Sequence, residues 1–401
     1  MNLEFPAPPS FPPSEHTLTS IEGLKAAGVA AGIKASGAPD VALLVSDVPM
    51  AAAGIFTTNH FAAAPVKLCR SHLLRSHGNV RAVVVNSGNA NACTGAQGER
   101  DAIAMCEQVA KALGCPVHEV LVCSTGVIGV KLPMEKVQKG IDAAVAALSS
   151  EPEAGRRFLK AIMTTDAFAK EASTKVGDAV FAGVAKGAGM IQPNMATMLS
   201  FVATNVELRA EMIKRALPGI AQASFNAVHV DTHTSTNDTF LMLSRKTVKG
   251  DPTWSKHAEV VARRLAWLIA RDGEGATKVT TVEVTGAATD DAARAIAQRV
   301  VGSALVRTAL YGNDPNWGRF TSAVGNCPEV RDARSLSCVL QGIEVFKAGE
   351  PAPFDKAAAS KAMAVEDVRL ELKLKDGPGK ASLMTSDLGY RYVQVNAEYT
   401  T

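Results

Sequence analysis

The hydrophobic positions of the chain fall into short apolar runs separated by amphipathic stretches. The runs Val41–Val45, Val83–Val85 and 120–123 (VLVC) have the length of buried strands. Residues Val368–Leu374 alternate between apolar and polar, which predicts a half-buried strand. A turn containing glycine and proline follows it, so we expect a second strand over Ala381–Gln394.

Three other stretches have the spacing or the start signal of a helix. Residues 99–113 and 256–270 carry apolar side chains three and four positions apart. Thr289 precedes two acidic residues and predicts an N-cap for a helix over 290–301. The side chains expected to face inward are Ile103, Cys106, Ala110 and Leu113 in the first helix and Val261, Leu265, Leu268 and Ile269 in the second. Because strands and helices are mixed throughout, the predicted class is α/β, or mixed α+β.

Composition narrows the functional classes without selecting one. The chain has 401 residues, which fits two lobes or one large α/β unit. The 42 Lys and Arg residues exceed the 39 Asp and Glu residues by three, which gives no case for binding to nucleic acid or to a membrane surface. No apolar run is long enough to span a membrane.

The N-terminus and the cysteines suggest where the protein acts. The first 15 residues lack a basic region followed by an apolar core, so they do not resemble a secretory signal; their prolines favour an extended arm. The seven cysteines are odd in number and show no CxxC spacing, which favours reduced thiols in a cytoplasmic protein.

The segment with the most chemical information is 181–206, FAGVAKGAGMIQPNMATMLSFVATNV. From composition alone it is a loop that enters a strand. A glycine-rich loop beside Lys186 also suggests phosphate binding, but the P-loop places its lysine after the glycines and follows it with Ser or Thr. Here Lys186 comes first, so the pattern argues against a nucleotide site.

The same segment resembles the self-cleavage motif of the ornithine acetyltransferases, also called glutamate N-acetyltransferases, of arginine biosynthesis. The resemblance covers nearly the whole chain and is carried by ordered blocks that include AAGVAAGIKASG, GIFTTN, VVVNSGNANACTG, CSTGVIG, IMTTDAFAKEA, KGAGMIQPNMATML, STNDT, RDGEGATK, DPNWGR and YVQVNAEYTT. It implies a DmpA/ArgJ-like α/β fold, a sandwich of mixed sheets flanked by helices.

The resemblance implies that the bond between Ala196 and Thr197 breaks, leaving an α chain of residues 1–196 and a β chain of residues 197–401. Thr197 would then hold a nucleophilic hydroxyl and a free α-amine. An α-amine has a pKa of about 7.7–8.0, so it can act as the base that a threonine hydroxyl needs. The two chains would remain associated as an αβ heterodimer and pair further, typically as α2β2.

The resemblance also assigns the remaining site residues. In the STGVIG block, the Thr125 hydroxyl and the Gly126 N–H would form the oxyanion hole, although without the resemblance this block is a polar turn at a strand end. Substrate contacts carry over to Thr164 (with the neighbouring Thr165 as the less favoured choice), Lys186, Thr197, Glu274, Asn396 and Thr401. From sequence alone these positions are a helix end, a solvated lysine, a surface turn and a frayed tail.

The implied reaction moves the acetyl group of N²-acetyl-L-ornithine to Thr197 and then to L-glutamate. The resemblance implies no metal and no bound cofactor, and in some members acetyl-CoA serves as a co-substrate. Two alternatives stay open: a hydrolase or aminopeptidase with the same nucleophile, and a paralogue that acts on another acyl amino acid. His233, at a position where the family has an acid, motivates the second.

Two features compete with these assignments. His229 and His233 have the spacing of a helical zinc site, but the surrounding threonine-rich run favours a loop and lacks the HExxH glutamate. Cys93 and Cys123 lie beside site blocks, yet no histidine is placed to activate them, so we expect buried structural thiols.

Overall fold

The computed structural model describes residues 11–192, 198–231, 233–250 and 252–398. They form two compact units. The large unit comprises the described residues of 11–226 and 233–269, and the small unit those of 227–231 and 270–398. The predicted break between residues 196 and 197 lies outside the described residues, so the division into α and β chains stays a prediction.

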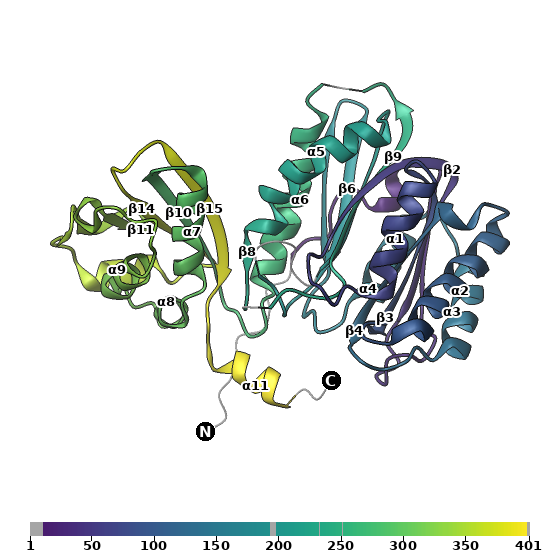
Figure 1. Ribbon diagram of the computed structural model, residues 1–401, viewed down its shortest axis with the longest axis horizontal. Helices are drawn as coiled ribbons and strands as arrows, with labels where there is room; N and C mark the ends of the chain where they lie inside the picture. Colours follow the sequence, from purple (N-terminus) through teal and green to yellow (C-terminus); the bar gives the residue numbers. More distant parts are fainter. Residues whose placement is uncertain (1–10, 193–197, 232, 251, 399–401) are drawn as a thin grey trace. The chain divides into compact units, whose positions relative to one another are not determined.

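The large unit is built on one mixed sheet, which has eight strands among the described residues. The strand order is β4-β3-β2-β9-β7-β6-β5, with β1 paired to β2 (Figure 1). The pairs β3–β4 and β7–β9 are parallel and the other pairs antiparallel. The strands are β1 (Leu24–Val29), β2 (Val41–Phe56), β3 (Asn79–Asn89), β4 (Val120–Val127), β5 (Lys170–Val176), β6 (Ala179–Lys186), β7 (Leu199–Val206) and β9 (Thr239–Val248).

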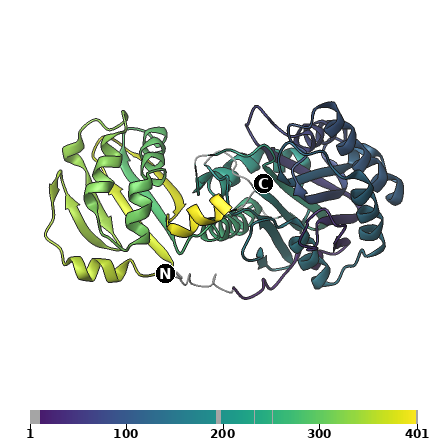
Figure 2. The same cartoon turned by 90° about the horizontal axis from the view of Figure 1, so that it is seen from below.

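Helices cover both faces of this sheet, which is why most of its strands are apolar on both sides. On one face, α2 and α3 pack side by side against strands that include β2 and β4 (Figures 1 and 2). On the other face, Phe158 of α4 packs edge-on against Phe201 of β7. The helices are α1 (Ala64–Arg75), α2 (Gly95–Leu113), α3 (Met134–Ala146), α4 (Pro152–Ile162), α5 (Ala210–Gln222) and α6 (Trp254–Arg271).

The small unit has its own mixed sheet, with seven strands in the described part of the chain, in the order β13-β12-β11-β14-β10-β15-β8. Helix α7 packs on β10 and β15, and its Ile296 and Val300 enter a separate apolar core. The elements are β8 (Val228–His229), β10 (Val279–Ala287), β11 (Ser337–Leu340), β12 (Ile343–Lys347), β13 (Glu350–Pro351), β14 (Asp367–Lys373), β15 (Gly379–Ser386), α7 (Asp290–Val301), α8 (Ala304–Tyr311), α9 (Trp317–Gly325), α10 (Lys356–Ala362) and α11 (Tyr390–Glu398).

Several sequence expectations are confirmed. The structure has two mixed sheets with helices, as the predicted fold class requires. The Thr289 hydroxyl accepts a hydrogen bond from the Ala292 N–H and caps α7 at the predicted residue. All four side chains expected to face inward from α6 are buried.

Two expectations about local structure were wrong in part. In α2, Cys106 and Ala110 are buried as expected, but Ile103 is 40% exposed, and Ala102, Met105 and Val109 complete the buried face. The strand predicted to reach Gln394 ends at Ser386. There the Asp387 carboxylate accepts backbone hydrogen bonds from the 277–278 segment, and the chain continues as helix α11.

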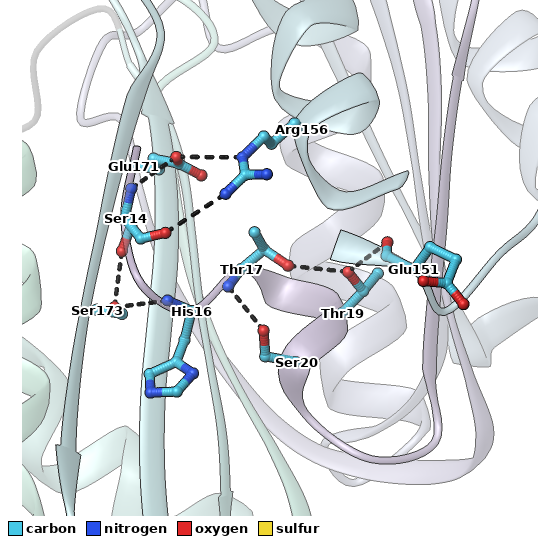
Figure 3. Close-up of polar contacts among 9 residues, drawn as sticks. All are labelled: Ser14, His16, Thr17, Thr19, Ser20, Glu151, Arg156, Glu171 and Ser173. Atoms are coloured by element: carbon cyan, nitrogen blue, oxygen red, sulfur yellow. Dashed lines mark hydrogen bonds and ion pairs between the residues drawn. The ribbon is translucent and has the colours of Figure 1, made fainter. Parts of the chain in front are cut away.

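The part of the N-terminal arm that the structure describes lies on β5, the last strand of the large sheet. The Ser14 N–H donates to a Glu171 carboxylate oxygen at 2.8 Å, and the Ser14 hydroxyl donates to that of Ser173 at 2.7 Å (Figure 3). Arg156 of α4 pairs with the same Glu171 at 3.5 Å. The arm therefore covers an edge strand that would otherwise be open to pairing with another chain.

Candidate functional site

The predicted oxyanion residues end strand β4 inside the large unit. Thr125 is buried, and Gly126 has φ = +133°, a conformation that side chains rarely adopt. A Cβ on Gly126 would lie 2.3 Å from the backbone carbon of Gly88 on β3. This position therefore requires glycine both for its backbone angle and for the close approach of the two strands.

Lys186 ends strand β6, and its ammonium group reaches the predicted oxyanion residue. Its Nζ donates a hydrogen bond to Thr125 Oγ1 at 3.0 Å. Since the Thr125 oxygen accepts this bond, its own O–H is left to donate elsewhere. Lys186 is 2% exposed, so the interpretation of this residue as a solvated lysine is wrong.

A buried carboxylate, Asp166, connects the predicted Thr164 loop to the Lys186 strand. It accepts hydrogen bonds from the N–H of Thr164 at 2.8 Å, from the N–H of Gly187 at 2.7 Å and from Lys170 Nζ at 2.6 Å. Burial by itself would raise the pKa of Asp166. The ammonium groups of Lys170 and Lys186 and the hydrogen bond from the Gly187 N–H together outweigh burial and hold its pKa well below the usual range.

Lys34 adds a further positive charge to this cluster. Its ammonium group donates to the carbonyl of Pro39 at 2.7 Å. Burial, followed by the positive charge of Lys186, lowers the pKa of Lys34 to about 8, although the carboxylates of Asp40 and Asp166 oppose this shift. The cluster thus contains Lys34, Lys170 and Lys186 against two carboxylates. A local excess of positive charge, on the buried Lys170 and Lys186 and the partly buried Lys34, suits the binding of an anion or the stabilisation of a developing negative charge.

The small unit contains the other predicted contact residues that the structure describes. Asn396 of α11 donates from Nδ2 to a carboxylate oxygen of Glu274 at 2.9 Å. The loop and the helix pack closely because Gly275 has φ = +76° and a Cβ there would lie 2.6 Å from the backbone nitrogen of Tyr392. Burial, followed by the carboxylates of Asp231 and Glu274, raises the pKa of Tyr392.

The structure thus groups the predicted residues into two sets, one in each unit. Thr125, Gly126, Lys186 and Thr164 belong to the large unit, and Glu274 and Asn396 to the small unit. Ala196, Thr197 and Thr401 lie outside the described residues.

Sequence reasoning did not single out Asp166, Asn237 or Asp238, although all three lie in blocks that carry the resemblance. The TTDAFAK and STNDT blocks were the available signal, because an acid or an amide inside a quoted motif can serve as a buried hydrogen-bond partner. The site therefore includes polar groups that bind other site residues in addition to those predicted to bind substrate.

The two competing features are also resolved by local structure. His229 lies in strand β8 and is not helical, which argues against the helical zinc spacing. In the described part of the chain, no group of three or more His, Cys, Asp or Glu side chains could hold a metal ion. Cys123 is buried as expected and its pKa is raised well above the usual value, whereas Cys93 is exposed, contrary to expectation.

A pocket of about 410 Å³ in the large unit is separate from the cluster of Lys34, Asp166, Lys170 and Lys186. It lies between the N-terminal arm, α4, β5 and α6, and its lining includes Phe11, Arg156, Lys160 and Arg264. It contains none of the predicted site residues, so its size alone does not associate it with the chemistry.

Comparison with known proteins decides the family. The sequence matches the ArgJ family over residues 25–401. The chain belongs to the ArgJ family. It is therefore an acyltransferase of arginine biosynthesis, as the resemblance implied.

Two relatives with similar sequences agree with the family assignment. The arginine biosynthesis bifunctional protein ArgJ of Rhodopirellula baltica is 45% identical, with 98% of this chain and 99% of that protein aligned. The protein of the same name from Symbiobacterium thermophilum is 46% identical over 96% of this chain and 98% of its own length. A crystal structure of ornithine acetyltransferase with ornithine, from Mycobacterium tuberculosis, is 42% identical and covers 46% of this chain and 96% of that one, with a TM-score of 0.41.

In the described part of the chain, no helix is both long enough and apolar enough to cross a membrane.

Proposed function

We propose that this ArgJ-family chain transfers the acetyl group of N²-acetyl-L-ornithine to L-glutamate through an ester on Thr197. The observation that carries the proposal is the buried hydrogen bond from Lys186 to Thr125, beside a glycine that the backbone requires. A threonine hydroxyl held in this way and a neighbouring backbone N–H are the donors that an acyl-transfer oxyanion needs.

In the first half-reaction, the Thr197 hydroxyl attacks the acetyl carbonyl carbon, and the Thr197 α-amine takes the hydroxyl proton. The carbonyl oxygen becomes an oxyanion that the Thr125 hydroxyl and the Gly126 N–H stabilise. The C–N bond then breaks, the proton passes to the leaving nitrogen, and ornithine departs. In the second half-reaction, the glutamate amine attacks the ester, giving N-acetylglutamate and regenerating Thr197.

The substrate is a zwitterion, so its recognition requires a few placed charges. We assign Lys186 to a substrate carboxylate and Glu274 to a substrate ammonium group, with Asn396, Thr164 and Thr401 as polar contacts. The hydrogen bond between Asn396 and Glu274 supports their assignment to one recognition surface. The excess of positive charge around Lys186 supports its assignment to an anionic group.

The proposal includes self-cleavage between Ala196 and Thr197, because Thr197 acquires its free amine only when that bond breaks. The resulting chains, 1–196 and 197–401, would associate as αβ and pair as α2β2 in the cytoplasm. No cofactor or metal takes part in this scheme. Acetyl-CoA is a candidate second acetyl donor, to be tested in place of N-acetylornithine.

The decisive experiment incubates the purified protein with N-acetylornithine and glutamate in the absence of acetyl-CoA. We expect ornithine and N-acetylglutamate in equal amounts, and intact mass spectrometry should show two chains. Free acetate in place of N-acetylglutamate would instead indicate a hydrolase. An uncut, inactive wild-type chain, or a Thr197→Ala variant that is still cleaved, would overturn the proposal.

A further inference from the structure

The STNDT block, Ser235–Thr239, connects two separate parts of the predicted catalytic region. It leads into strand β9, and all of its side chains are buried. The Asn237 N–H donates to the Ser235 hydroxyl oxygen at 3.1 Å, and the Thr57 hydroxyl donates to the Ser235 carbonyl at 2.5 Å. The block is therefore fixed by its own hydrogen bonds and by Thr57, the residue that follows strand β2. An element that positions other groups needs to be fixed in this way.

Asn237 binds the strand that ends in the oxyanion pair. Its Nδ2 donates to the carbonyl of Ser124 at 2.8 Å and to the carbonyl of Ala90 at 2.6 Å. The Thr236 hydroxyl donates to Asn237 Oδ1 at 2.6 Å, which fixes the amide in this orientation. Ser124 directly precedes Thr125, so Asn237 holds the peptide unit that carries the predicted oxyanion residue.

Asp238, the next residue, binds Met198, which follows the predicted nucleophile in sequence and directly precedes strand β7. Its Oδ1 accepts a hydrogen bond from the Met198 N–H at 3.1 Å. The Thr239 N–H donates to the Met198 carbonyl at 3.0 Å. Both backbone groups of Met198, the residue that follows Thr197 in sequence, are therefore held by this block.

We propose that Asn237 and Asp238 form a brace that sets the predicted nucleophile Thr197 in register with the oxyanion pair Thr125 and Gly126. The proposal deepens the proposed function and rests on it, since the brace positions groups that the acyl transfer uses. Neither residue is a catalytic residue. Asn237 acts through the Ser124 carbonyl, and Asp238 acts through the Met198 amide.

The surroundings of Asp238 indicate that hydrogen bonding, and not a negative charge, is its contribution. The side chain is fully buried, and among the described residues its Oδ2 accepts no hydrogen bond of ordinary geometry. Burial raises the pKa of Asp238 well above its usual value. The Met198 N–H bond, the charge of Lys186 and the Ser235 and Thr57 hydroxyls lower this pKa, but burial is the larger effect. A neutral acid and an amide offer the same acceptor oxygen to the Met198 N–H, so asparagine should replace Asp238 well.

The test exchanges the two neighbouring side chains separately. Asp238→Asn should keep kcat for ornithine release within about five-fold of the wild type. Asn237→Asp removes both donors and faces an oxygen toward two carbonyl oxygens, so kcat and the fraction of self-cleaved chain should fall strongly. Misplacement of a reacting group by about 1 Å typically lowers the rate about 100-fold. Asp238→Ala, which cannot accept the Met198 bond, should behave like Asn237→Asp, with KM within about three-fold.

Ser244→Ala is the matched control. Ser244 is buried on the same strand β9, and its hydroxyl accepts from the Leu208 N–H and donates to the Val206 carbonyl. Its loss should lower Tm without changing kcat or cleavage. If the brace variants lowered only Tm, as this control does, or if Asp238→Asn were as impaired as Asp238→Ala, the brace would be overturned while the wild-type activity still supported the proposed function.

Two further outcomes are separable. Asn237→Ser takes the place of Asn237→Asp if the latter does not fold, and the same loss of kcat is expected. An inactive and uncut wild-type chain would overturn the proposed function itself, and the brace with it, because no nucleophile would remain to be positioned.

Discussion

The two sets of predicted site residues differ in how firmly the protein holds them. In the large unit, Lys186 and Thr125 are 2% and 3% exposed and belong to a network of buried charges and hydrogen bonds. In the small unit, Asn396 is exposed on the terminal helix and reaches Glu274 through a single hydrogen bond. The two sets thus lie in environments of very different dielectric.

The difference corresponds to two tasks. Groups that stabilise a transition state must be fixed before the reaction and shielded from water, because their electrostatic effect depends on a low dielectric. Groups that admit two different amino acids in turn must remain accessible. We therefore expect substitutions in the buried set to affect stability or kcat, and substitutions in the exposed pair to affect KM. Lys186, which the proposed function also assigns to a substrate carboxylate, should affect both kcat and KM.

The largest effect is expected from Asp166→Asn, which leaves Lys170 and Lys186 without the buried carboxylate. Breaking a buried ion pair on one side destabilises a protein by about 3–5 kcal/mol. Urea unfolding monitored by circular dichroism measures this loss. A change below about 1 kcal/mol would show that the buried cluster is no more important to folding than a surface pair.

The same variant should change how stability depends on pH. The pKa of Asp166 in the folded protein is lowered, so its contribution is fully present above the unfolded value of about 3.9 and is lost as the pH falls below it. As the pH falls below about 5, the unfolding free energy of the wild type should therefore decrease more steeply than that of Asp166→Asn. Parallel curves of unfolding free energy against pH would contradict this assignment.

Thr125→Val should lower kcat by about 100- to 1,000-fold, because it removes one oxyanion donor and also the acceptor of the Lys186 hydrogen bond. Steady-state kinetics of ornithine release measures the change. Thr204→Val is the control, since Thr204 is equally buried on β7 and its hydroxyl binds the Val180 carbonyl. Equal losses of kcat in the two variants would mean that the effect is structural.

Asn396→Ala should raise KM by about three- to ten-fold with kcat nearly unchanged, because removing one exposed polar contact costs about 0.5–1.5 kcal/mol. Glu274→Gln should have a larger effect on KM, since it removes a charge from the same pair. Varying the donor and the acceptor in separate titrations shows which substrate each residue contacts. A fall in kcat without a change in KM would place this pair with the buried set.

The smallest effect is expected for Asp47→Asn, which breaks a surface ion pair in the same unit as Asp166. Asp47 pairs with Arg245 at 2.5 Å, but its side chain is 57% exposed. Exposed pairs contribute about 0–1 kcal/mol, so the unfolding free energy should change by less than 1 kcal/mol. The two ion-pair distances are similar, so the contrast with Asp166→Asn compares an exposed carboxylate with one held in a buried cluster. A loss as large as that of Asp166→Asn would contradict this view.

The elements that were predicted well have strong local signals. Helix α7 begins at its capping threonine, and α6 buries the expected face, because both depend on residues within one or two turns. The strand predicted to run to Gln394 failed because the Asp387 side chain binds backbone groups more than 100 residues away. No local pattern contains that information.

By itself, the sequence determined the mixed α/β class, several helix and strand positions and, through ordered motifs, the family and the candidate residues. Only the tertiary structure decided that Lys186 is buried against Thr125 and that Asp166 lies between two lysines. It also decided that Asn237 binds strand β4 while Asp238 binds the residue before strand β7. The physical reason is that burial and hydrogen-bond partners arise from strands brought together by sheet pairing. Residue type and spacing alone do not specify them.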